Sequence, residues 1–110
     1  MTRITGLELE LLVATLNRKL RRPSAPFYFD ASGKVINNIG HIFLDHAPAY
    51  GGYALREVAN QSGGESFYWP RWRRVSADVL EAFLDGQIMA LDAIQSVPDE
   101  NAVSVVQEKK

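Results

Sequence analysis

The stretch from Gly40 to Trp69 constrains the fold more than any other part of this chain. It contains runs that alternate between two faces and are rich in β-branched and aromatic residues, a pattern typical of strands. Pro48 cannot donate to a strand ladder and ends the first run, while Gly51-Gly52 and the segment Asn60–Gly64 are turn signals between the runs. Short turns join antiparallel strands, so the stretch predicts a three-stranded meander. The predicted strands are Ile39–His46, Tyr53–Ala59 and Phe67–Trp69.

A helix is predicted before this sheet, over Thr5–Leu20. Thr5 and Glu8 fit a capping box, in which each side chain satisfies a backbone amide of the first turn. Apolar residues then recur at helical spacing and define one buried stripe. The stripe consists of Leu9, Leu12, Val13, Leu16 and Leu20.

A second helix is predicted after the sheet, over Ser76–Ile94, with Ser76 as its N-cap. Its buried stripe is predicted to be Leu80, Phe83, Leu84, Leu91 and Ile94, with Ile88 beside it. Pro98 follows, and residues 98–110 are predicted to be a flexible or extended tail. Residues 1–97 are therefore expected to form one domain.

The segment Pro26–Asn37 predicts a hairpin, because Phe27-Tyr28-Phe29 is strongly β-prone and Asp30–Gly33 is a good turn sequence. A small sheet needs a cover on one face, which the flanking helices can supply. The predicted fold class is α+β: an antiparallel sheet of three to five strands, with the N-terminal and C-terminal helices packed on one face.

The amino-acid composition excludes several kinds of functional site and argues against some kinds of partner. The absence of cysteine excludes disulfides, thiolate nucleophiles and cysteine-based metal sites. The formal net charge of −1 argues against nucleic-acid binding through the overall field of the protein. No apolar run reaches the roughly 18 residues of a membrane span, and the N-terminus does not resemble a signal peptide. A cytoplasmic protein with no membrane contact is expected.

The histidines do not form a convincing catalytic or metal site. His41 and Asp45 share a face of a strand but lie about 13 Å apart at ~3.3 Å per residue, and His46 faces the other way. A structural or surface role is therefore predicted for all three, although other carboxylates could join them in space. Without a cofactor or nucleophile motif, we expect a non-enzymatic protein with no cofactor and no metal; an enzyme using a carboxylate–histidine site is a remote alternative.

Small residues form a stripe on the second helix, at Ala82, Gly86, Ala90 and Ala93. Such a stripe permits close packing of the helix on the sheet or on the first helix. The other interpretation is a homodimer seam through Ala82, Gly86 and Ala90.

The most distinctive feature is the segment Phe67–Arg74, in which three arginines are interleaved with four aromatic residues. These residue types dominate binding hot spots, and they can also stack on bases and neutralise phosphates. Phe67 and Trp69 are expected on one face of the strand and Tyr68 on the other, with an exposed loop from Pro70 to the helix start. The predicted partner-binding residues are Tyr68, Arg71, Trp72, Arg73 and Arg74. A protein partner is favoured over nucleic acid because the chain is net acidic, and the remaining interpretation is that these side chains only support the fold.

A set of residues in the second half of the chain resembles a group of short uncharacterised phage and prophage proteins. The matching residues are Leu44, Asp45, Tyr50 to Tyr53, Asn60, Gly63, Gly64, Pro70 and Arg71. The resemblance implies a phage accessory protein without an assigned activity. Proteins of this kind often bind and block a host protein, including defence nucleases, and a nucleic-acid-binding accessory module is the alternative.

Overall fold

The computed structural model describes the backbone of residues 5–108 and the side chains of residues 5–95. It confirms the α+β class, with the strands divided between two antiparallel sheets, β1-β2 and β3-β4-β5. The elements in chain order are α1 (Gly6–Lys19), β1 (Phe27–Phe29), β2 (Val35–Asn37), β3 (Ile42–Ala47), the 3-10 helix η1 (Pro48–Tyr50), β4 (Gly52–Val58), β5 (Glu65–Trp69) and α2 (Ala77–Glu108).

Helix α1 begins with the predicted capping box. The Thr5 hydroxyl accepts a hydrogen bond from the Glu8 amide (3.1 Å), and Glu8 Oε1 accepts one from the Thr5 amide (2.8 Å). The predicted stripe is the buried face: Leu9, Val13 and Leu16 are buried and two further leucines pack beside them. The helical spacing of the apolar residues therefore predicted the orientation of α1 correctly.

Helix α2 also begins where its N-cap predicts, since Ser76 Oγ accepts a hydrogen bond from the Val79 amide at 3.3 Å. Leu80 and Leu84 are fully buried, while Phe83 and Leu91 pack against the core. The prediction for Ile94 is wrong, because this side chain is 59% exposed.

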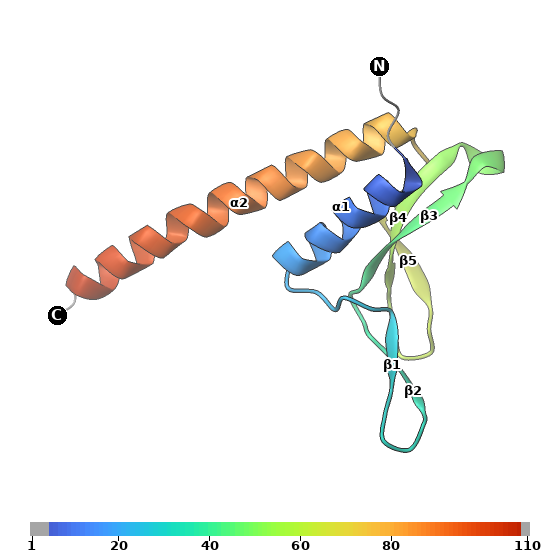
Figure 1. Ribbon diagram of the computed structural model, residues 1–110, viewed down its shortest axis with the longest axis horizontal. Coiled ribbons are helices and arrows are strands. Elements are labelled where there is room, and N and C mark those ends of the chain that lie inside the picture. The colour runs from blue at the N-terminus through green and yellow to red at the C-terminus, as the bar shows by residue number, and fades with distance from the viewer. Residues whose placement is uncertain (1–4, 109–110) are drawn as a thin grey trace.

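Ile94 is exposed because it lies where α1, the helix that packs beside α2, ends. The two helices lie side by side and run in the same direction, and α2 extends beyond the end of α1 (Figure 1). Lys19 at the end of α1 pairs with Asp92, and its carbonyl accepts a hydrogen bond from Gln95 (2.8 Å). The predicted helix end at Ile94 is also wrong, since α2 passes through Pro98 and reaches Glu108. Proline removes one amide donor, which weakens a helix without always ending it.

The core lies between the two helices and one face of the three-stranded sheet. Ile42 of β3 and Leu55 of β4 belong to the same buried cluster as Leu16 of α1 and Leu84 of α2. Both helices therefore cover the same face, as the sequence predicted.

No helix among residues 5–108 is long and apolar enough to cross a membrane.

The opposite face of the three-stranded sheet is not covered by a helix within the described part of the chain (Figure 1). We call it the open face. Because alternate residues of a strand point to opposite faces, the strand register places on it Phe43, Asp45, Ala54, Arg56, Val58 and Phe67.

The hairpin β1-β2 projects away from the helices (Figure 1). Asn37 of β2 is tied to the turn between β4 and β5 by two hydrogen bonds with Gln61, of 2.7 and 2.9 Å. The aromatic side chains of β1 are all exposed, at 45% for Phe27, 52% for Tyr28 and 64% for Phe29. The hairpin therefore adds surface to the molecule but no core.

Candidate binding surface

The predicted exposed segment is a loop held at both ends by β4. Before the loop, Trp69 of β5 pairs with Leu55, and after it Val75 pairs with Tyr53 through two backbone hydrogen bonds of 2.8 Å. Leu55 and Tyr53 are only two residues apart, so residues 70–74 must leave the sheet between them. We call these five residues the Trp72 loop. Both ends of the loop are therefore anchored to the same strand of the sheet.

Trp72 lies at the middle of this loop with 89% of its surface exposed, as the sequence predicted. The guanidinium carbon of Arg71 lies 5.7 Å from the centre of the Trp72 ring, within the range of a cation–π contact. Arg71 and Arg73 are exposed, and neither forms a salt bridge with the side chains described for residues 5–95. The loop therefore presents an indole and two cations to solvent.

Arg74 differs from the other two arginines of the loop. Its Nη2 lies 2.8 Å from Asp45 Oδ2, its Nη1 donates to the Asp45 carbonyl at 3.1 Å, and only 13% of its side chain is exposed. This hydrogen bond from Arg74 holds the pKa of Asp45 below its ordinary value, although burial of the carboxylate acts in the opposite direction. Arg74 thus joins the loop to β3, and its charge is already paired.

Tyr68 is not part of the exposed loop surface. A bulge in β5 at Tyr68 shifts the register, so that Trp69 lies opposite Leu55 but Phe67 lies opposite Arg56. Trp69 consequently faces α2, where it stacks on Phe83 at 3.9 Å, and Tyr68 packs against the core beneath Arg22. The expectation that Phe67 and Trp69 share a face is wrong because the bulge inserts one residue between them.

A groove of about 430 Å³ lies beside the Trp72 loop on the open face. The residues that line it are Tyr50, Phe67, Arg71, Trp72, Arg73 and Arg74. Tyr50 and Phe67 were not predicted to belong to this surface. Tyr50 is 80% exposed at the end of η1, next to Gly51, whose φ of 101° turns the chain back into β4. The Pro-x-x-Gly spacing around it was the available signal, since a tight turn places its central residues at the surface.

The structure does not bring His41, Asp45 and His46 together. The ring of His41 is buried with Nδ1 2.9 Å from the Pro23 carbonyl oxygen, His46 stacks on Tyr53 at 3.9 Å, and Asp45 is paired with Arg74. Each contact is structural. Across the described residues, no group of three histidine or carboxylate side chains is placed to hold a metal ion.

The small-residue stripe of α2 faces solvent. Ala82, Gly86 and Ala90 are all exposed, and a Cβ added to Gly86 would have no heavy atom within 4 Å. The interpretation that Gly86 permits close packing on the sheet or on α1 is therefore wrong. The homodimer seam through these residues stays a prediction.

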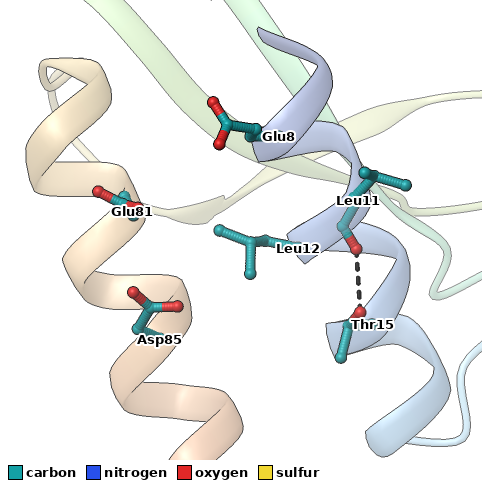
Figure 2. A pocket seen from close by; sticks show the side chains of 6 residues that line it. All are labelled: Glu8, Leu11, Leu12, Thr15, Glu81 and Asp85. Atoms are coloured by element: carbon teal, nitrogen blue, oxygen red, sulfur yellow. Dashed lines mark hydrogen bonds between the residues drawn. The ribbon is translucent and has the colours of Figure 1, made fainter. Parts of the chain in front are cut away.

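A second surface groove, of about 290 Å³, lies between α1 and α2. Figure 2 shows Leu11, Leu12 and Thr15 on α1, together with carboxylates from both helices. The carboxylates belong to Glu8, Glu81 and Asp85. This groove is acidic, whereas the groove beside the Trp72 loop is basic.

Comparison with protein-family models, with curated proteins and with solved structures finds no match for this chain. We therefore infer its function from the geometry of its own surfaces.

Proposed function

We propose that this protein is a non-enzymatic accessory protein that binds another protein through the Trp72 loop and the adjoining groove. The observation that carries the proposal is the 89% exposure of Trp72 on a loop fixed at both ends. Exposing a tryptophan leaves a large apolar surface in water, and a loop anchored at both ends loses less conformational entropy on binding than a free segment does. Tryptophan is also among the residues most enriched at binding hot spots.

The chemistry of the loop favours an acidic partner surface. Arg71 and Arg73 flank the indole and carry charges that a carboxylate of the partner would complement. Tyr50 and Phe67 extend the contact surface along the groove. The resemblance to phage accessory proteins makes a host protein the expected partner, with a defence or regulatory factor as the kind of target such proteins block.

Affinity capture from host-cell lysate tests this proposal, with the full chain immobilised. The test variant combines Arg71→Ala, Trp72→Ala and Arg73→Ala, and leaves the structural Arg74 in place. It should fold normally and weaken partner binding by about 2 kcal/mol or more, the loss expected for a hot spot. The matched control is Tyr28→Ala with Lys34→Ala, which removes an exposed aromatic and a cation from the hairpin and should bind like wild type.

Nucleic acid is the second candidate partner, because the exposed indole of Trp72 lies within cation–π distance of the Arg71 guanidinium and this pair could stack on bases. Nuclease treatment and salt distinguish nucleic acid from a protein partner. A protein partner should remain bound after nuclease treatment and respond weakly to salt. Binding that disappears with nuclease, or that falls steeply and linearly with salt on logarithmic axes, would assign the loop to nucleic acid instead. Equal capture of the partner by the test and control variants would show that the Trp72 loop does not contact the partner.

A further inference from the structure

The groove between α1 and α2 has the chemistry to receive a cationic aromatic group. Leu12 points from α1 toward α2, and Leu11 beside it is 60% exposed, so the groove offers apolar surface (Figure 2). Glu8, Glu81 and Asp85 surround this surface, and none of them forms a salt bridge with the side chains described through residue 95. Its volume of about 290 Å³ is below the roughly 300–1,000 Å³ typical of small-molecule pockets. The groove is therefore suited to one large side chain.

The Trp72 loop is the complement of this groove on the same chain. It carries one exposed indole between two arginines that have no described salt-bridge partner, whereas the groove carries two leucines among three carboxylates. The whole chain has a net charge of only −1, so these opposite charges are segregated on the surface of a nearly neutral molecule. Complementary charges of this kind steer association and fix the relative orientation of two proteins.

We propose that a second copy of this chain occupies the groove, through its Trp72 loop. The indole of one copy packs on Leu11 and Leu12 of the next, and Arg71 and Arg73 pair with the surrounding carboxylates. The contact is intermolecular, because Trp72 is exposed and not docked within its own chain. Two different surfaces meet in such a contact, so it is heterologous and builds a ring or an open chain of copies.

This proposal does not depend on the proposed function, but it uses the same loop. Self-association and partner binding therefore exclude each other. Assembly would keep Trp72 covered until a partner whose acidic surface binds the loop more tightly displaces the second copy. The two proposals fail separately. A protein that is monomeric but still captures a partner would contradict only the self-association. A protein that self-associates but captures no partner would contradict only the proposed function.

Sedimentation velocity of the purified full chain at increasing concentration tests the proposal. The average mass of the wild-type chain should rise above that of the monomer and fall again when salt is added, because the rim contacts are exposed ion pairs. Trp72→Ala removes an exposed side chain without touching the core, and should raise the dissociation constant roughly 30-fold, the loss of one hot-spot residue.

Charge reversal provides the decisive control. A loop variant with Arg71→Glu and Arg73→Glu should be monomeric, and so should a groove variant with Glu81→Arg and Asp85→Arg. Mixing the two variants should restore association, since each loop then meets a groove of opposite charge in the other variant. Recovery on mixing also shows that both variants are folded.

Three outcomes would overturn the proposal. The first is a wild-type chain that stays monomeric up to about 1 mM, the limit of a weak specific contact. The second is association that survives both charge reversals. The third is association that only Gly86→Leu removes, which would place the contact on the small-residue stripe of α2.

Discussion

The side-chain amide of Asn17 on α1 pairs with the backbone of Ile42 on β3. Asn17 Nδ2 donates to the Ile42 carbonyl at 2.8 Å, and the Ile42 amide donates to Asn17 Oδ1 at 3.0 Å. Asn17 is 2% exposed. β3 is an outer strand of its sheet, so this amide supplies the hydrogen bonds that a neighbouring strand would otherwise make. The contact joins α1 to the sheet and satisfies the strand edge at Ile42.

Asn17→Ala should destabilise the protein by about 2 kcal/mol or more, because it leaves a buried amide and a buried carbonyl without partners. Chemical denaturation of the variant checks this, with Glu10→Ala as the control on the exposed side of α1. The control should change the free energy of unfolding by no more than about 0.5 kcal/mol. An equal effect of the two substitutions would mean that water satisfies Ile42 when the amide is removed.

Leu84→Ala should destabilise the protein by about 2–5 kcal/mol, because Leu84 is fully buried between α2 and the sheet. The same truncation at Leu11, which is 60% exposed on α1, should cost far less. Thermal unfolding of both variants tests the orientation of the helices. A melting temperature unchanged by Leu84→Ala would contradict the packing of α2.

Helical periodicity and capping residues predicted α1 and the start of α2 because both signals are local. The Thr5–Glu8 capping box spans three residues, and the stripe from Leu9 to Leu16 is a property of spacing alone. Asn17 carries no such signal. A polar residue in a helix ordinarily indicates the surface, and the backbone group that it satisfies lies 25 residues away.

The candidate surface was only partly predictable for the same reason. Arg71, Arg73 and Arg74 are chemically identical in the sequence, but only Arg74 meets Asp45, which lies 29 residues away. The position of Tyr68 depends on the bulge in β5 between the Leu55–Trp69 and Arg56–Phe67 pairs, and the alternation of residues along a strand does not predict such a bulge. The exposure of Trp72, in contrast, follows from Pro70 and the nearby helix N-cap, which force the chain into a loop.

Gly52→Ala should disturb the Trp72 loop as well as the sheet. A Cβ on Gly52 would lie 2.6 Å from the Val75 carbonyl oxygen, and the residue has a φ of 118°, which side chains rarely permit. We expect a loss of about 3 kcal/mol or more and a change in tryptophan fluorescence, because Val75 closes the loop. Gly33→Ala is the matched control: its φ is 87° but its Cβ would meet nothing within 4 Å, so the cost should be about 1–2 kcal/mol. Similar losses at both glycines would show that Val75 moves away freely.

The ion pair between Asp45 and Arg74 should make stability depend on pH in the acid range. The Arg74 hydrogen bond lowers the pKa of Asp45 in the folded state, while the unfolded chain titrates near the ordinary value of about 3.9. A lowered folded pKa means that the unfolded state binds the proton more readily. The stabilisation is therefore complete above about pH 4 and is lost as the pH falls through the folded pKa.

Asp45→Asn removes this titration while keeping the size of the side chain. The difference in free energy of unfolding between wild type and Asp45→Asn should be largest at neutral pH, and it should shrink as the pH falls below about 4. Urea denaturation from pH 7 to pH 2.5 measures it. Arg74→Ala should raise the pKa of Asp45 toward its ordinary value in an NMR titration, because Arg56, at 3.4 Å, is then the remaining cation. A stability difference that is the same at pH 3 and pH 7 would show that the charge on Asp45 does not hold the Trp72 loop to β3.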